Sequence, residues 1–357
     1  GFPEAPVSEC RVPIADYGDG ALDAFTSLLG RSISGKPRGA DLMAMRASHY
    51  QFSRQGNISL GGSCRILPSA DGHIAINLAR DSDWELLPAL LLNEVSPEWT
   101  SLELQVRERA TEELVNQGRL LGLAIANASP PLPDARNWYT MSQVSAPIKT
   151  RTRPPRVIDL SSLWAGPLCS RLLHWSGAEV IKVEDTIRPD GARLGSQSFY
   201  DFLNSGKAER TLALKSDQGR EALTRLIRSA DIVIEGSRPR ALRQMGIFAE
   251  QLLEEVPGLC WLSISGYGRN NPQANWIAYG DDAGIAAGLS KILKRDTGKW
   301  VIGGDAIADP LTGMHAALAA LACWRAGGGQ LMSLSLVETV QHCIAFSGKG
   351  AEQGLEQ

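Results

Sequence analysis

Apolar residues in the second half of the chain fall into short runs that alternate with helical patterns. The continuous runs occupy residues 157–160, 179–184, 232–235 and 259–264. Between them, apolar residues recur at helical spacing in residues 166–175, 218–229 and 249–254. Strands that are apolar throughout and separated by helices predict a parallel sheet with helices on both faces. We therefore expect an α/β fold with a Rossmann-like sheet layer in this half.

The first half has a different pattern. Two helical patterns, at residues 19–30 and 41–52, open it. Two apolar runs, at 58–68 and 73–78, then flank Asp71-Gly72, a dipeptide that favours a hairpin turn. Amphipathic helices are expected at 82–92 and 99–117. These elements predict a second, smaller α/β domain.

Six prolines lie between residues 128 and 155, a density that is typical of a linker. We place the main boundary near residue 150. Residues 1–150 are then the smaller α/β domain plus the linker, and residues 151–357 are the Rossmann-like domain.

Composition narrows the possible partners. The 36 Lys and Arg residues are balanced by 39 Asp and Glu residues, so there is no global positive field to attract nucleic acid. No apolar run reaches the length of a membrane-spanning helix, and the first residues lack a signal-peptide pattern. Six scattered cysteines without metal-ligand spacing fit a reduced compartment. We expect a cytoplasmic protein without a metal site and without nucleic-acid or membrane partners.

One carboxylate stands out because Asp309-Pro310 begins a helix rich in small residues. The free N–H groups and the dipole at a helix start favour negative charge. Asp309 is therefore a candidate for covalent chemistry. The alternative is that Asp309 only caps its helix, since Asp followed by Pro is an ordinary helix start.

Ligands of open parallel sheets bind at the carboxyl ends of the strands. The loop after the first predicted strand, residues 161–167, has small residues that permit close approach of a ligand. The next loops carry cations that either hold phosphate groups or belong to a solvated surface. The polar residues at the ends of these strands and in the loops after them include Lys182, Glu184, Arg188, Asn204, Lys207 and Arg238.

Residues 156–347 resemble the larger domain of the class III CoA-transferases. This CaiB/BaiF-like family also contains the α-methylacyl-CoA racemases. The matching blocks are residues 156–160 with 165–167, 177–184, 202–204 with Lys207, 230–235 with Arg238 and Pro239, 263–268, and Ala308-Asp309 with Gly313 and Ala316.

The resemblance implies a CoA-transferase in which Asp309 is the nucleophile. Its carboxylate would attack an acyl-CoA thioester, pass through a mixed anhydride and an aspartyl-CoA thioester, and hand CoA to a second carboxylic acid. Coenzyme A is then a substrate, and no cofactor is bound permanently. The resemblance also implies an acyl-pocket loop at Gly61 and Gly62. The implied CoA-binding residues are Trp164, Ala165, Gly166, Lys182, Glu184, Asn204, Lys207, Arg238 and Tyr279.

The order of the two domains departs from the family. Residues 54–76 resemble the smaller domain, which in the family follows the catalytic Asp but here precedes it. The chain therefore resembles a circularly permuted member, or a rearranged descendant of a tandem protein. Family dimers are interlocked, so a homodimer is expected, with a hetero-oligomer as the alternative.

Two substitutions leave other functions open. Trp164 stands where some transferases carry a side-chain amide, and Tyr279-Gly280 stands where racemases carry a catalytic histidine. Without that histidine the racemase mechanism is disfavoured. The alternatives are a 2-methylacyl-CoA racemase or epimerase, and a non-catalytic CoA-binding subunit that supports an active homologue.

Overall fold

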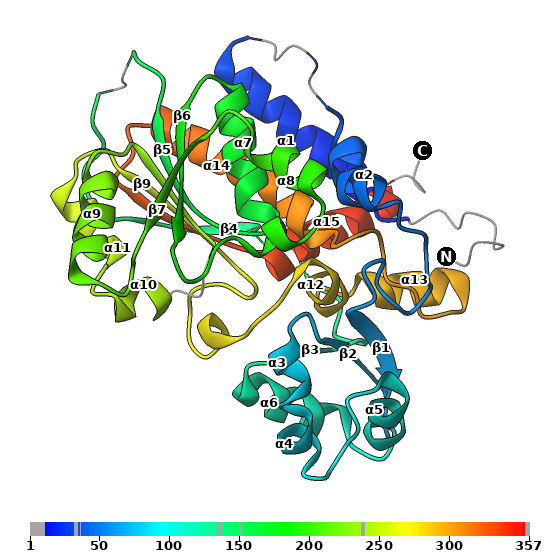
Figure 1. Cartoon of the computed structure of the whole chain (residues 1–357). Helices are drawn as coiled ribbons and strands as arrows, with labels where there is room; N and C mark the ends of the chain where they lie inside the picture. The colour runs from blue at the N-terminus through cyan, green and yellow to red at the C-terminus, as the bar shows by residue number, and fades with distance from the viewer. Residues whose placement is uncertain are drawn as a thin grey trace.

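A computed structural model describes residues 11–353, apart from 32–34, 36, 135–136, 150–151 and 237–239, and gives only the backbone for residues 348–353. Its strands form one sheet of seven strands and one of three (Figure 1). The prediction of an α/β fold with a mainly parallel sheet and a smaller α/β unit is confirmed. No helix in the described part of the chain is both long enough and apolar enough to cross a membrane.

The large sheet has the strand order β4-β10-β9-β8-β5-β6-β7. All neighbouring pairs are parallel except β4 with β10. The four strands expected from the apolar runs are present as β5, β6, β8 and β9. Its strands are β4 (Tyr139–Gln143), β5 (Arg156–Leu160), β6 (Glu179–Asp185), β7 (Ala208–Leu212), β8 (Ile232–Glu235), β9 (Cys260–Ser265) and β10 (Gln330–Ser335).

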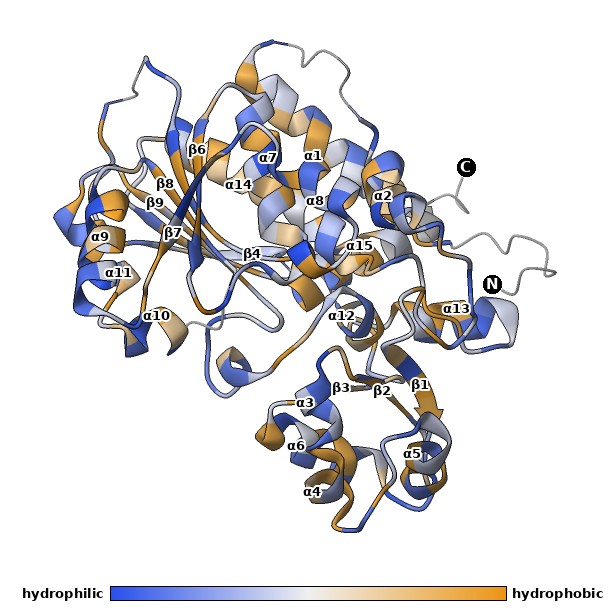
Figure 2. Ribbon diagram, viewed as in Figure 1, coloured by the Kyte–Doolittle hydropathy of each residue, from blue (hydrophilic) through white to orange (hydrophobic). Residues whose placement is uncertain are grey.

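Alternate side chains of these strands enter two separate cores. In β8, Ile232 and Ile234 face one core, whereas Val233 faces the other. One face is covered by α7 (Ala165–Trp175), α8 (Gln197–Asn204) and α14 (Ala308–Arg325), and the other by α9 (Asp217–Arg228) and α11 (Ala249–Glu255). The short α10 (Arg240–Gln244) lies beside α11 (Figure 1). Figure 2 shows the expected colouring, with hydrophobic central strands and mixed surfaces on α9 and α11.

The small sheet is antiparallel, with β2 (His73–Asn77) between β1 (Cys64–Pro68) and β3 (Ala124–Asn127). Pro68 faces His73 across the turn at Asp71-Gly72, so the predicted hairpin is confirmed. The two helices that we expected here are each divided in two. They are α3 (Asp81–Trp84), α4 (Leu87–Leu91), α5 (Trp99–Val106) and α6 (Thr111–Leu121), which share a core with β1, β2 and β3.

Contacts cross the boundary that we placed near residue 150. Strand β4 pairs with β10 in the large sheet. Helices α1 (Ile14–Leu29) and α2 (Gly39–Tyr50) pack on α14. A Cβ on Gly18 of α1 would lie 2.8 Å from Met314 Cε, so the two helices are in close contact. The division into domains at residue 150 stays a prediction, and the seven-stranded layer takes elements from both sides of it.

The small sheet joins the large layer through α12 (Gly280–Ala286), which packs on β2 and β3 and also on α15 (Leu336–Gln353). Asp282 of α12 is buried, and its Oδ1 accepts hydrogen bonds from Asn77 Nδ2 of β2 at 2.9 Å and from the Tyr279 N–H at 3.0 Å. Its Oδ2 is buried without a partner among the described residues. Burial raises the pKa of Asp282 to about 7.

This raised pKa makes the junction sensitive to pH. The folded state holds a proton on Asp282 that the unfolded chain releases near pH 4, so ionisation weakens the fold between about pH 4 and about pH 7. We expect Asp282→Asn to gain stability relative to the wild type as the pH rises, by up to about 1.4 kcal/mol per pH unit in that window. Urea unfolding of both proteins at pH 5 and pH 8 measures the difference. Asp81→Asn, at an exposed position of α3, is the control; an equal difference at both pH values would contradict the prediction.

Candidate functional site

Asp309 lies in the first turn of α14, as predicted, but its side chain does not cap that helix. The N-cap position is Ile307, and Asp309 Oδ2 accepts a hydrogen bond from the Gly280 N–H at 3.1 Å. Asp309 is thus held by the start of α12. Gly280 permits this contact because a Cβ there would lie 2.3 Å from Ala306 O and 2.4 Å from Asp309 Oδ2.

Asp309 lines a cavity of about 450 Å³. The cavity lies where several parallel strands of the large sheet end. Residues that follow β5, β6, β8 and β10 line it, together with the end of β9, so its position agrees with the expected ligand site of an open parallel sheet. Four predicted site residues line it, namely Ala165, Gly166, Tyr279 and Asp309.

The charge on Asp309 depends on opposing effects. Burial raises its pKa to about 7, the nearby Arg46 lowers it, and Asp281 raises it. We expected the helix start to keep this carboxylate ionised. Removal from water instead outweighs the favourable contacts, because desolvation penalises the charged form. Asp309 is therefore poised between its acid and its carboxylate near neutral pH.

Arg46 reaches this site from α2. Its Nε donates to Asp305 Oδ1 at 3.1 Å and to Oδ2 at 3.0 Å, and Nη2 also bonds Asp305. Asp305 is buried in the turn that precedes α14. The sequence offered no signal for this pair, since its members lie 259 residues apart and neither belongs to a recognisable motif.

Trp164 stands behind the cavity and does not line it. Its side chain is buried, with its ring edge-on to Phe199 at 5.2 Å between centroids. The Arg46 guanidinium carbon lies 5.6 Å from the Trp164 ring. Trp164 therefore helps to position Arg46 through a cation–π contact.

Lys182 is completely buried beneath the loop that follows β5. Its Nζ donates to Ser161 O at 3.0 Å and to Asp190 Oδ2 at 2.8 Å. Asp190 Oδ1 in turn accepts from the Leu163 N–H at 2.9 Å. Lys182 and Asp190 thus hold the loop from which Ser162, Leu163, Ala165 and Gly166 line the cavity.

Lys207 has a similar buried position. Its Nζ donates to Asp159 Oδ2 at 3.3 Å, to Ser170 Oγ at 2.7 Å, to Asn204 Oδ1 at 3.0 Å and to Pro167 O at 3.0 Å. The ammonium group of Lys207 is thus bound by four oxygen atoms of the protein itself. Burial lowers the pKa of Lys207 to about 8, although Asp159 opposes the shift. Lys207 therefore ties β5 and α7 to Asn204 at the end of α8.

The other predicted residues lie elsewhere. Glu184 Oε2 accepts from Arg193 Nε at 2.9 Å at the edge of the sheet. Gly61 and Gly62 belong to the loop before β1, with Gly62 at a φ of 82°. Neither glycine is among the residues that line the Asp309 cavity. Arg238 falls outside the described residues. The binding roles of these residues and of Trp164, Lys182, Asn204 and Lys207 stay predictions.

Two cations outside the implied set of CoA-binding residues line the cavity. Arg188 is an exposed residue after β6, and Arg80 comes from the small-sheet unit. Arg80 Nε donates to Asp83 Oδ1 at 2.9 Å, and Nη2 donates to Gly122 O at 3.2 Å. Arg188 follows a strand and was part of the cation cluster in the sequence. Nothing in the sequence indicates that Arg80 lies opposite that cluster.

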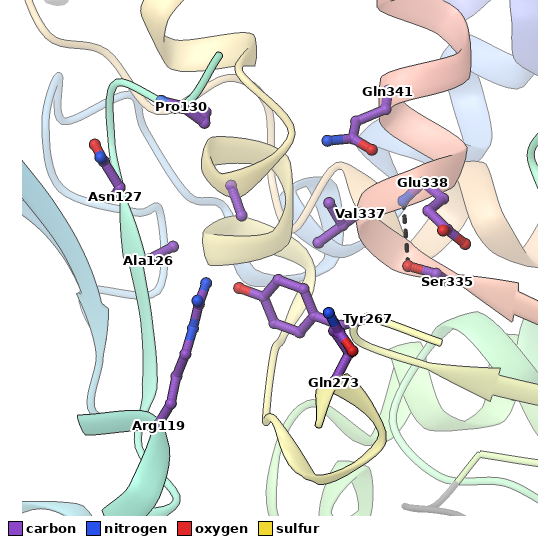
Figure 3. Close-up of a pocket in the computed structure, with 11 residues that line it drawn as sticks. Arg119, Ala126, Asn127, Pro130, Tyr267, Gln273, Ser335, Val337, Glu338 and Gln341 are labelled. Carbon is purple, nitrogen blue, oxygen red and sulfur yellow. Dashed lines mark hydrogen bonds between the residues drawn. The ribbon is translucent and has the colours of Figure 1, made fainter. Parts of the chain in front are cut away.

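A second, polar cavity of about 270 Å³ is lined by residues of α6, β3 and α15, among others (Figure 3). Figure 3 shows Arg119 extending from α6 toward the ring of Tyr267. The Arg119 guanidinium carbon lies 5.3 Å from that ring and 3.8 Å from the ring of Trp276. Because Trp276 also lines the Asp309 cavity, Arg119 braces one wall of that cavity from the small-sheet unit.

Comparisons with known proteins show the family to which the chain belongs. The model of CoA-transferase family III matches residues 155–351. The match begins after the small sheet, so the permuted order stays a prediction. A formyl-CoA:oxalate CoA-transferase from Escherichia coli is 32% identical over 196 residues, which cover 52% of this chain and 47% of that protein. A protein of the same name from Shigella boydii is 32% identical over 200 residues, with the same coverage.

A solved structure of Rv3272 from Mycobacterium tuberculosis is similar to this chain, with a TM-score of 0.50 and 25% sequence identity. The similarity covers 59% of each chain. The chain spans about half the length of the curated relatives that it matches. The family match covers more than half of this chain and includes β5 to β10, the cavity loops and Asp309. The chain belongs to CoA-transferase family III.

Proposed function

We propose that the protein transfers coenzyme A from an acyl-CoA to a carboxylic acid, with Asp309 as the nucleophile. The observation that carries the proposal is the position of Asp309. In a chain of CoA-transferase family III, its carboxylate lines the cavity at the strand ends and is oriented by the Gly280 N–H. The relatives are named as CoA-transferases, and the chain spans about half of their length, so the activity of the whole protein is part of the proposal.

The reaction consists of acyl exchanges at carbonyl carbons. Asp309 attacks the thioester carbonyl, the C–S bond breaks, and a mixed anhydride and the CoA thiolate form. The thiolate then attacks the Asp309 carbonyl of the anhydride and releases the donor acid as a carboxylate. The acceptor carboxylate attacks the resulting aspartyl-CoA thioester, and the released thiolate attacks the new acyl carbonyl. The second acyl-CoA leaves, and Asp309 returns to its carboxylate.

The cavity supplies partners for the different parts of CoA. Arg80 and Arg188 approach it from opposite units and are suited to bind phosphate groups. Ala165, Gly166 and Gly236 line the cavity with small residues, so the main chain can come close to a ligand there. In this proposal, Ala165, Gly166 and Tyr279 contact CoA directly. Lys182, Asn204 and Lys207 do not contact CoA in this proposal, but hold the loops at the strand ends in place.

The racemase alternative requires a second acid–base group opposite Asp309. The position where the racemases have histidine falls near Tyr279-Gly280, and Gly280 has neither a side chain nor room for one. None of the five histidines, all within the described residues, lines the cavity. His315 is buried, with its Nδ1 2.8 Å from Leu311 O. This arrangement favours CoA transfer over proton abstraction.

Covalent trapping tests the role of Asp309. We expect incubation with an acyl-CoA and hydroxylamine to convert Asp309 to a hydroxamate, detectable by mass spectrometry of its peptide. Asp309→Asn should show no label and a loss of transfer activity of about a thousandfold or more, because the nucleophile is absent. Asp281→Asn, at a carboxylate that does not line the cavity, is the control and should still be labelled at Asp309.

A wild-type protein that stays unlabelled with every acyl-CoA would exclude the transferase mechanism. If it still binds CoA, it acts as a non-catalytic CoA-binding subunit. Exchange of deuterium into C2 of a 2-methylacyl-CoA would instead identify a racemase.

The pH dependence tests the influence of Arg46. Since the ionised carboxylate attacks, the rate of Asp309 labelling should rise with pH around a midpoint near 7. Arg46 lowers the pKa of Asp309, so Arg46→Gln should move the midpoint to higher pH by about one unit. Arg46→Lys keeps the charge and should move it less. The measurement is single-turnover labelling from pH 5.5 to 9. An unchanged midpoint in Arg46→Gln would show that Arg46 does not influence the ionisation of Asp309.

A further inference from the structure

A cavity of about 590 Å³ borders the turn that leads into Asp309. Asp305 and Ile307 of that turn line it. Leu60, which directly precedes Gly61 and Gly62, lines it from the segment between α2 and β1. Figure 1 shows this segment running from α2 past α13 (Leu289–Thr297) to the small sheet. The cavity therefore connects the turn of the proposed nucleophile with the loop predicted to cover the acyl group.

The walls of this cavity are mainly apolar. They come from α1, α2, α13 and the segment before α14, and include Ile14, Met43, Leu289, Leu293, Val301 and Ile302. The two charged residues in the described lining are Arg54, which is exposed, and Asp305, whose carboxylate is engaged by Arg46. Groups that could bind a second carboxylate are therefore scarce deep inside, and burial of hydrocarbon is the main source of affinity.

The size of the cavity points in the same direction. A volume of about 590 Å³ lies within the range of pockets that enclose whole small molecules. A formyl or an oxalyl group has no hydrocarbon with which to occupy such a space. The formyl and oxalyl groups in the names of the relatives are therefore not acyl groups that these apolar walls would bind.

We propose that this cavity receives the hydrocarbon part of the acyl group, so that the substrates are CoA thioesters of apolar carboxylic acids with several carbons. The inference rests on the proposed function, because the thioester carbonyl must meet Asp309 while the chain enters the cavity. Asp305 lines this cavity and is bound by Arg46, whose charge acts on Asp309, so the ion pair links the wall of this cavity to the proposed nucleophile. The other cavity then holds CoA itself.

Binding of a series of acyl-CoAs to Asp309→Asn tests the cavity without any covalent step. Calorimetry with formyl-, acetyl-, butyryl-, hexanoyl- and octanoyl-CoA measures the dissociation constants. We expect the affinity to rise about fourfold with each methylene until the cavity is full. Equal affinities from acetyl- to octanoyl-CoA would overturn the proposal.

A substitution in the cavity wall should then change the length of the acyl chain that binds most tightly. Ala47 of α2 lines the cavity, whereas Ser48, the next residue of the same helix, is exposed and does not. Ala47→Phe should weaken binding of octanoyl-CoA by tenfold or more and leave acetyl-CoA unchanged, because the ring fills the space for the chain. Ser48→Phe is the matched control and should behave like the parent protein. Equal losses in both variants, or none in Ala47→Phe, would exclude a chain at this wall.

The outcome separates this inference from the proposed function. If formyl- or oxalyl-CoA labels Asp309 and the affinity does not rise with chain length, the transferase function stands and the apolar substrate class is rejected. If the affinity rises with chain length but Asp309 of the wild type is never labelled, the cavity binds the acyl chain and the transferase function is rejected.

Discussion

The ion pair between Arg46 and Asp305 holds the site together. It joins α2, from the first half of the chain, to the turn that carries Asp309, from the second half. Asp305 is buried, and such a carboxylate is stable in its charged form only beside a well-placed cation. The same guanidinium lowers the pKa of Asp309 and lies over the Trp164 ring. One contact therefore fixes the turn, favours the ionised form of the proposed nucleophile and borders the apolar cavity.

Buried charges also support the floor of the Asp309 cavity. Lys182 with Asp190, and Lys207 with Asp159, are removed from water and satisfied by carboxylates, hydroxyls and main-chain oxygens. Removing one partner of such a pair leaves an uncompensated charge, which costs far more than the pair contributes. These groups thus specify the course of the strand-end loops. Two cations also line the cavity: Arg188 is exposed, whereas the guanidinium of Arg80 already binds Asp83 and Gly122 O.

Much of the architecture was predictable because local patterns and burial agree. The apolar runs at β5, β6, β8 and β9 are buried on both faces, so their composition reveals them. Strand β7 was missed because it is an exposed edge strand of mostly polar residues. Strand β4 was missed for the same reason, since four of its five residues are exposed and it lies in a segment rich in proline.

The sequence by itself determined the family, the parallel layer and Asp309 at a helix start, because these depend on short motifs and on the spacing of apolar residues. Only the tertiary structure decided what surrounds that carboxylate. Arg46, Arg80 and Gly280 come from three different elements, and their contacts with the site follow from packing over long separations in the chain. The raised pKa of Asp309 has the same origin, since it reflects the loss of water when α2, α12 and α14 come together. Desolvation depends on how distant segments pack around the carboxylate, so the residues next to Asp309 in the sequence do not reveal it.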